Sequence, residues 1–493
     1  MNHTTPASGE ISGLAARGVF WSGIQMFGSK LVSFAVFALL SHLLSPSSFG
    51  LIALASLFIS FLQIFIGRGF GEAVVQRVEL EDEHLSTAFW TNLLAGAILT
   101  MLCSLAAPLA ASLFHEPDLA KIIPWFSLVF IFAGFSTIQS ALLRRKLDFK
   151  KLAWRSLIAD LTAGAVAIVM ALAGLGVWSL VALNLVTSLV SAVVLWNVSG
   201  WRPGVHFSAK HFQQMFHFGL NIIGIDVLNF LNRHADDVLI GYFLGAELLG
   251  YYTIAYKILV TLTDLLTTIT NAVALPAFAR LQGEMQLVRS AFLFAVRIVS
   301  IVSIPAFIGI CLLANELLPV VFGPTWGASV PVLQVLSFIG ILHSIFYLHN
   351  SLVTGVGKPS WHLYMTLLNA VTNVVAFAIA VRWGITAVAA AYVIRGYILS
   401  PLEVWMVNKA AQIEVGKYLS QFIRPVIGSL VMSLVVLVLK KTFTGVLGVL
   451  PALGLYAVAG ALVYFLTIHI MEPTFWPGLL KLAQTSFAGQ SIR

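Results

Sequence analysis

The chain has 493 residues, of which 59% are hydrophobic and only 10% are charged, and its mean hydropathy is +0.94. An ordinary globular domain carries about 25% charged residues, so this composition excludes a soluble fold. The formal net charge of +8 would suggest nucleic-acid binding in a soluble protein, but in a membrane protein the placement of basic loops explains it better.

Apolar segments long enough to cross a bilayer recur along the whole chain. A spanning helix needs about 20 mostly apolar residues, and polar or Pro- and Gly-containing turns separate the segments. They predict an all-α integral membrane protein of about fourteen transmembrane helices; twelve or thirteen stay open, because 236–248 could extend the seventh segment. The segments are 19–43, 49–67, 86–109, 123–142, 154–174, 177–197, 213–232, 249–273, 291–313, 330–354, 361–381, 384–406, 420–439 and 446–469.

Lys and Arg residues gather in every second loop, most densely at 144–151. This asymmetry predicts that both termini are cytoplasmic. The basic run at 144–151 is interpreted as a topology signal that also contacts anionic lipid headgroups, with a specific ligand site as the alternative. On the opposite side, the loops hold only Lys121, Arg233, Arg382, Lys440 and Lys441.

The sequence also contains signs of an internal duplication. The turn LLSPSSFGLIALA, ending at Ala55, resembles FLGAELLGYYTIA, ending at Ala255, and GVWSLVA from Gly176 resembles GITAVAA from Gly384. The alternative is chance similarity between apolar segments. We predict two pseudo-symmetric six-helix bundles at 19–198 and 213–407, with two further helices at 420–470. The remaining parts are an N-terminal cytoplasmic segment at 1–18, an inter-lobe linker at 199–212 and a cytoplasmic tail at 471–493.

Motifs for nucleotide or metal chemistry are absent from the sequence. No P-loop, HExxH or GxSxG pattern occurs, and Cys103 and Cys311 lie inside apolar segments without CxxC or Cys/His spacing. We therefore expect no catalytic residue, no metal site and no cofactor. A membrane-embedded glycosyltransferase would need an acidic or metal-binding loop, which the sequence lacks.

Polar residues recur at helical spacing inside several apolar segments. An ionisable group near the bilayer centre costs about 2.5 to 3.5 kcal/mol on insertion scales, so such groups normally face protein or a hydrated cavity. The alternative is helix packing, because Ser, Thr and Asn often join helices. The stripes are Ser22, Gln25, Ser29 and Ser33 beside Lys30; Asp226, Asn229 and Arg233; Thr253, Lys257, Thr261, Asp264, Thr268 and Asn271; His343, Tyr347, Asn350 and Thr354; and Thr366, Asn369 and Asn373.

Two stretches resemble a known family. NRHADDVLIGYFLGAELLGYYTIAYK from Asn232 is similar to the central signature of Wzx-type flippases, the prokaryotic polysaccharide transporters of the multidrug/oligosaccharidyl-lipid/polysaccharide (MOP) superfamily. LSPSSFGLIALA, with FGEAVVQR from Phe70, resembles their N-terminal signature. The resemblance extends to about residue 430. It implies a flippase that moves an undecaprenyl-diphosphate-linked oligosaccharide from the cytoplasmic to the periplasmic leaflet of the bacterial inner membrane, for exopolysaccharide or lipopolysaccharide biosynthesis.

The polar stripes fit the chemistry that this resemblance implies. A lipid diphosphate needs cations, and its sugars need hydroxyl and amide groups. Transport by alternating access of a polar central cavity is expected, with a polysaccharide polymerase and chain-length machinery as further partners and no nucleic acid. The alternative is a drug or cation antiporter of the same superfamily. The substrate-binding candidates are Lys30, Lys257, Arg395, Tyr347, Asn350 and Asn369, and the ion-coupling candidates are Asp226 and Asp264.

Overall fold

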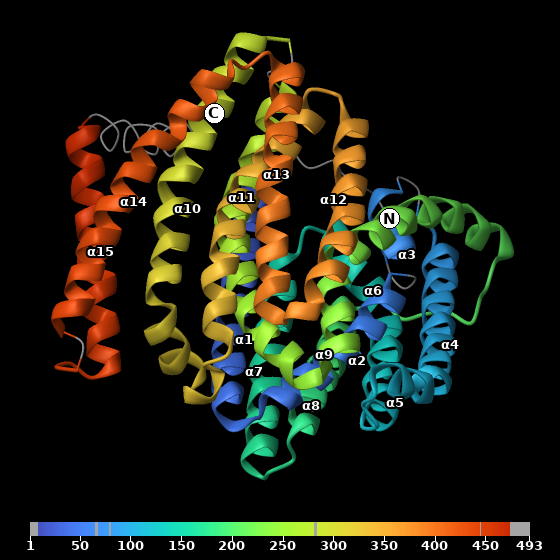
Figure 1. Ribbon diagram of the computed structural model, residues 1–493. Helices are drawn as coiled ribbons and strands as arrows, with labels where there is room; N and C mark the ends of the chain where they lie inside the picture. The colour runs from blue at the N-terminus through green and yellow to red at the C-terminus, as the bar shows by residue number, and fades with distance from the viewer. Residues whose placement is uncertain (1–7, 65–67, 78–79, 281–282, 444, 474–493) are drawn as a thin grey trace. The chain divides into compact units, whose positions relative to one another are not determined.

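The computed structural model describes residues 8–64, 68–77, 80–280, 283–443 and 445–473 (Figure 1). Every regular element in these ranges is a helix, which confirms the all-α prediction. The helices are α1 (Ser8–Leu43), α2 (Pro46–Gln63), α3 (Arg68–Gln76), α4 (Asp82–Phe114), α5 (Leu119–Ser127), α6 (Val129–Arg145), α7 (Phe149–Leu172), α8 (Val177–Ser199), α9 (Ala209–Arg280), α10 (Met285–Phe322), η1 (Pro324–Trp326), α11 (Ser329–Gly355), α12 (Pro359–Ala380), η2 (Val381–Trp383), α13 (Ile385–Ala411), α14 (Val415–Phe443) and α15 (Val449–Met471).

The helices follow the predicted membrane segments one by one. Twelve helices of the described residues are long and apolar enough to cross a membrane, and the apolar part of α1, Phe27–Leu43, is a shorter thirteenth. One of the twelve, α9, has a break at Gly245 (φ 83°, ψ 174°), which divides it into two crossings. The count of about fourteen is therefore confirmed.

The seventh predicted segment needs a correction. It was expected to end at 232, but α9 continues without interruption to Gly245. The polar residues after 232 suggested a loop, yet a helix ends where its backbone is broken, and a left-handed φ is a conformation that Gly adopts readily. The possibility that 236–248 extends this segment holds as far as residue 244, while the eighth crossing begins directly after the break.

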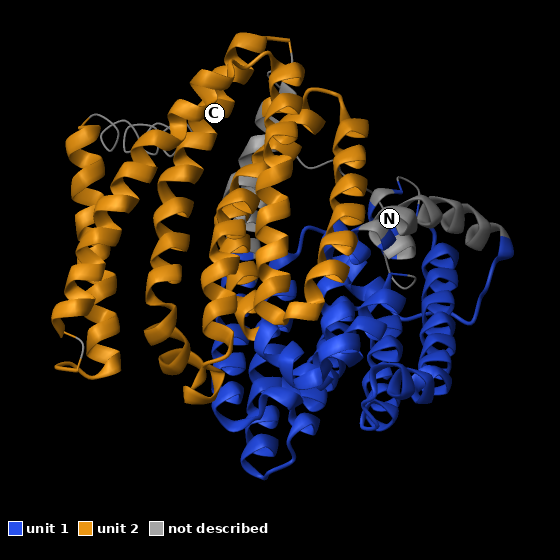
Figure 2. Ribbon diagram, viewed as in Figure 1, with its two compact units in different colours: residues 1–253 blue, residues 254–493 orange. Residues whose placement is uncertain are grey.

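The chain divides into two compact units, residues 1–253 and 254–493 (Figure 2). In unit 1, α7 packs against α1 and α8, while α4 packs against α5 and α6. In unit 2, α10 packs against α11 and α14, α11 packs against α13, and α14 packs against α15. The boundary between the units falls inside α9 and not in the predicted linker at 199–212, so the two six-helix lobes stay a prediction.

The two similar turns make reciprocal contacts within unit 1. A Cβ atom added at Gly50 would collide with the backbone carbonyl of Ala246, and one at Gly250 would collide with that of Pro46. Pro46 and Ala246 are as far apart in sequence as Gly50 and Gly250, so each turn contacts the other through equivalent positions. Such exchange of equivalent contacts is the pattern of a two-fold relation. It supports the predicted duplication and explains why both positions are Gly.

Candidate functional site

A cluster of polar side chains joins α11, α12 and α13 in unit 2. Nη1 of Arg395 donates a hydrogen bond to Oδ1 of Asn369, and Asn369 is also hydrogen-bonded to Glu403, which is only 4% exposed. The hydroxyl of Tyr392 lies 3.2 Å from Nε2 of His343, and the Arg395 guanidinium lies 5.5 Å from the centre of the Tyr392 ring. Three helices thus contribute to one connected network.

The network balances its own charge. Arg395 supplies one positive charge and Glu403 one negative charge, and the Asn369 amide connects them, which is how a buried ion is normally tolerated inside a membrane protein. Nε of Arg395 and Oε2 of Glu403 are buried and have no hydrogen-bond partner among the described residues. The cluster therefore has spare hydrogen-bonding capacity for water or for the hydroxyl groups of a ligand.

The structure brings together two of the predicted site residues and adds one that the sequence analysis missed. Arg395 and Asn369 are in direct contact. Glu403 was missed because its segment was expected to end at 406, whereas α13 continues to Ala411. Glu403 follows Arg395 by about two helical turns, so helical spacing places it on the same face. The spacing between Arg395 and Glu403 in the sequence was the signal that could have identified Glu403.

The other two candidates on α11 lie outside this hydrogen-bonded network in the described part of the chain. Tyr347 is 48% exposed, and Asn350 is half-buried. His343, on the same predicted stripe, does belong to the network. The stripe is therefore divided between a half-buried polar contact at His343 and a more exposed surface at Tyr347.

The predicted stripe on the second part of α9 is partly described. Lys257 is exposed and Asp264 is half-buried, while the side chains of Thr268 and Asn271 lie outside the described residues. The hydroxyl of Thr253 donates to the carbonyl of Leu249 at 2.8 Å, so it is bonded within its own helix. Asp226, the other ion-coupling candidate, also has its side chain outside the described residues.

The polar stripe of α1 serves helix packing at two of its positions. The hydroxyl of Ser29 donates to Asp160 on α7, and Nε2 of Gln25 donates to the hydroxyl of Ser156, also on α7, at 3.2 Å. The packing alternative is thus correct for Gln25 and Ser29. Lys30 follows Ser29 and is half-buried.

A buried carboxylate on α9 was also missed by the sequence analysis. Asp236 is 3% exposed and accepts a hydrogen bond of 2.7 Å from the hydroxyl of Tyr252, on the other side of the break at Gly245. Oδ2 of the neighbouring Asp237 lies 2.9 Å from Nδ1 of His234. The seventh predicted segment ended at 232, with an extension over 236–248 left open, so Asp236 was not counted as a membrane-buried acid. Its hydrogen bond with Tyr252 connects the two parts of α9.

The basic run at 144–151 makes structural contacts. Nη1 of Arg145 donates to the carbonyls of Val74, at 3.1 Å, and of Arg77, at the C-terminal end of α3. The carbonyls at the C-terminal end of a helix point away from its N–H groups and carry partial negative charge, so a cation there is favourable. Lys151 pairs with Asp148 at 3.0 Å. These contacts agree with a structural interpretation of this run and give no support to a ligand site there.

Residues 39–331 of the chain match the family described as "Polysaccharide biosynthesis protein". The chain is 27% identical to the succinoglycan biosynthesis transport protein ExoT of Rhizobium meliloti, over 95% of each protein. It is 25% identical to the teichuronic acid biosynthesis protein TuaB of Bacillus subtilis, over 83% of this chain and 85% of that protein. It is 28% identical to the lipopolysaccharide biosynthesis protein WzxC of Escherichia coli, over 66% of this chain and 67% of that protein.

Solved structures show which fold the helices form. The Lipid II flippase MurJ in an inward closed conformation matches with a TM-score of 0.74 and 16% identity, over 92% of this chain and 99% of that one. A multidrug resistance transporter of the MATE family, in the inward-facing conformation, matches with a TM-score of 0.63 and 17% identity, over 80% and 98% of the two chains. At these identities the likeness shows the fold alone.

Proposed function

This chain belongs to the polysaccharide biosynthesis protein family, and we propose that it is a flippase for an undecaprenyl-diphosphate-linked oligosaccharide. It moves the repeat unit from the cytoplasmic to the periplasmic leaflet by alternating access, and it is a transporter rather than an enzyme. The observation that carries this proposal is the match to ExoT, a named transport protein of polysaccharide biosynthesis, along 95% of both chains. The names of TuaB and WzxC point to the same area of biosynthesis.

The chain crosses the membrane many times, and three finer points belong to the proposal. The membrane is the bacterial inner membrane, both termini are cytoplasmic, and a polymerase takes over the flipped substrate. The asymmetry of Lys and Arg between alternate loops supports the orientation. The name of WzxC, a lipopolysaccharide biosynthesis protein, supports a lipid-linked sugar as the substrate.

We further propose that different polar residues bind different parts of the substrate. Arg395 is balanced by Glu403 through Asn369, so a diphosphate that bound Arg395 would have to compete with a buried carboxylate. The cluster on α11 to α13 is better suited to sugar hydroxyl groups, which the Asn369 amide can bind without a change of charge. Lys257, which is exposed on α9, is better suited to the diphosphate.

The remaining candidates keep their proposed roles. Lys30 is a second cation for the diphosphate, Tyr347 and Asn350 bind sugar, and Asp226 and Asp264 are the acids that couple transfer to an ion gradient. Support for the last role comes from the half-burial of Asp264 on a helix that crosses the membrane, since buried acids of this kind normally mark ion pathways.

The proposal is tested by leaflet transfer in proteoliposomes. Purified protein is reconstituted with a fluorescent undecaprenyl-diphosphate oligosaccharide in the outer leaflet, and a membrane-impermeant glycosidase reports how much of it stays accessible. We expect protein-dependent loss of accessibility, with no change in the mass of the lipid sampled before the glycosidase is added. A change in mass would indicate an enzyme, and transport of a cationic drug without lipid transfer would favour the antiporter alternative.

A further inference from the structure

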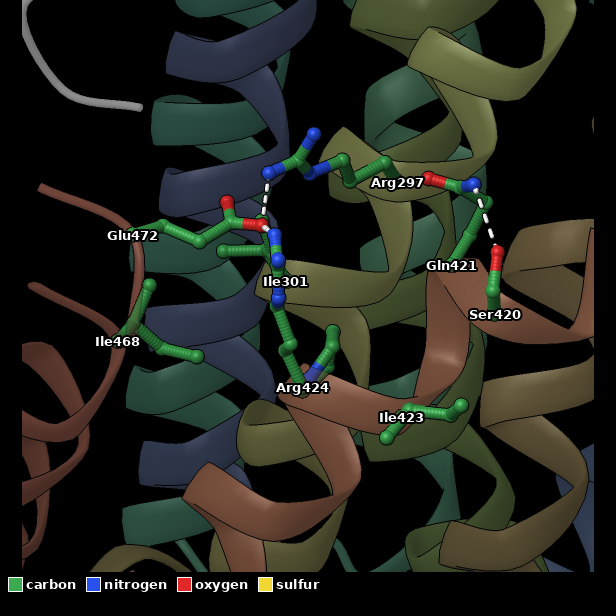
Figure 3. Close-up of a pocket in the computed structure, with 9 residues that line it drawn as sticks. Arg297, Ile301, Ser420, Gln421, Ile423, Arg424, Ile468 and Glu472 are labelled. Atoms are coloured by element: carbon green, nitrogen blue, oxygen red, sulfur yellow. Dashed lines mark hydrogen bonds and ion pairs between the residues drawn. The ribbon is translucent and has the colours of Figure 1, made fainter. Parts of the chain in front are cut away.

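Two arginines and a glutamate meet in a cavity of unit 2, at one end of the last two helices (Figure 3). The cavity has a volume of about 380 Å³ and lies among α10, α14 and the C-terminal end of α15 with the residue that follows it. Figure 3 shows the side chains of Arg297 and Arg424 directed toward the carboxylate of Glu472 from two different helices. The other lining residues are Ile301, Ser420, Gln421, Ile423, Pro425 and Ile468.

The charges in this cavity are unequal. Oε1 of Glu472 pairs with Nη2 of Arg297 and with Nη1 of Arg424, so two guanidinium groups share one carboxylate and the trio carries a net charge of +1. The side chain of Glu472 is 4% exposed, and its Oε2 is buried without a hydrogen-bond partner among the described residues. A ligand that binds these three side chains needs a negative charge for the two arginines and a hydrogen-bond donor for Oε2 of Glu472.

The lengths of α14 and α15 indicate that the cavity lies near the depth of the lipid headgroups. Glu472 directly follows α15, which at 1.5 Å per residue is about 35 Å long and just spans a bilayer core. The apolar part of α14 begins at Arg424 and ends at Lys440. Nζ of Lys440 pairs with Glu316 at 2.9 Å. Ile423 and Ile468 add apolar surface beside the charges.

We propose that this cavity binds the headgroup of an anionic glycerophospholipid of the phosphatidylglycerol type. The phosphodiester bridges the guanidinium groups of Arg297 and Arg424, whose planar forks match phosphate geometry. A headgroup hydroxyl donates to Oε2 of Glu472, and the glycerol and first methylenes contact the isoleucines. The lipid thereby joins α14 and α15 to α10. This role is separate from the proposed flippase activity.

The test is a lipid-binding measurement that requires no transport. Purified full-length protein in detergent is titrated with dioleoylphosphatidylglycerol, and bound lipid is counted by native mass spectrometry. We expect Arg424→Gln to bind about tenfold more weakly, because it loses a charge-assisted pair to phosphate. Lys417→Gln is the matched control. Lys417 is a cation on the same helix, but it pairs with Glu414 and does not line the cavity. We expect Lys417→Gln to bind like the native protein.

Three further ligands separate the sources of the phosphate. Dioleoylphosphatidylmethanol has the same phosphodiester without the hydroxyl, and we expect about tenfold weaker binding; equal binding would overturn the role of Glu472. Inorganic phosphate is expected not to displace the lipid, and displacement would overturn the lipid assignment. Undecaprenyl diphosphate competing at lower concentration than phosphatidylglycerol would assign the cavity to the transport substrate. Equal binding by native protein and Arg424→Gln, with both monodisperse, would overturn the site itself.

Discussion

Arg395 lies in the middle of α13, where hydrocarbon surrounds the bundle and an uncompensated guanidinium is costly. Glu403 on the same helix supplies the opposite charge, and Asn369 on α12 holds the two together. This arrangement makes each charged residue dependent on the other. Removal of one charge leaves its partner buried alone, whereas removal of both leaves a neutral helix pair.

That dependence leads to the first prediction. Arg395→Ala should destabilise the protein by about 3 to 5 kcal/mol, because it leaves Glu403 as a buried, unpaired charge. Adding Glu403→Gln to that variant should restore a large part of the loss, so the two changes should not be additive. The measurement is a double-mutant cycle of unfolding temperatures in detergent, with Tyr347→Phe as a control outside the network. Additive losses would mean that Arg395 and Glu403 are not coupled.

At the scale of single helices, the sequence predicts nearly all of the secondary structure. The reason is physical: a backbone in hydrocarbon must satisfy its hydrogen bonds internally, so each long apolar segment becomes a helix. The ends were predicted too short, as for α10, which runs from Met285 to Phe322 against an expected 291–313. Helices continue past the hydrocarbon region, where hydropathy carries no signal.

The site was less predictable than the helices. Helical spacing correctly placed polar residues on common faces, but it does not say which helix lies opposite. Gln25 and Ser29 turned out to contact α7, and Arg395 turned out to contact Asn369. Glu403 and Asp236 were missed because one lay near an expected helix end and the other beyond the expected end of the seventh segment. Partner identity depends on tertiary packing, which a single sequence does not contain.

The reciprocal turns of α2 and α9 provide the second prediction. Gly50→Ala and Gly250→Ala each place a methyl group against a backbone carbonyl of the opposite turn. We expect each to lower stability by about 1 to 3 kcal/mol, as overpacking does in a close-packed interior. Gly309→Ala is the control, because nothing lies within 4 Å of its added methyl group, and it should be neutral or slightly stabilising. The measurement is the thermal unfolding of the three variants and the native protein. If Gly50→Ala and Gly250→Ala were as stable as the native protein, the argument for a close contact would fail.

At the scale of the whole molecule, the third prediction concerns orientation. Fourteen crossings place both termini on one side, and the distribution of basic residues predicts that this side is cytoplasmic. Reporter fusions after Arg493 and within 144–151 should be active as cytoplasmic reporters, and fusions near Glu116 as periplasmic ones. The opposite pattern would show that the predicted orientation is wrong. Activity of the Arg493 fusion as a periplasmic reporter, with the 144–151 fusion cytoplasmic, would contradict an even number of crossings.

The energy source of transfer is the last prediction at this scale. The sequence holds no P-loop, so transfer runs either downhill, as polymerisation removes the flipped lipid, or by coupling to an ion gradient. Of the described acids, Asp236 is buried and hydrogen-bonded to Tyr252 across the break in α9. Asp264 is half-buried on a helix that crosses the membrane.

We therefore expect coupling through Asp264, with Asp226 as the second candidate. A gradient of about one pH unit supplies about 1.4 kcal/mol per proton, so it should change the ratio of transferred to untransferred lipid by up to about tenfold. Asp264→Asn should abolish this response while keeping the transfer seen without a gradient. Asp236→Asn is the matched control: it should lower the unfolding temperature and leave the gradient response of the folded fraction intact. If native transfer in proteoliposomes ignores the imposed gradient, transfer is driven downhill and both coupling candidates lose that role.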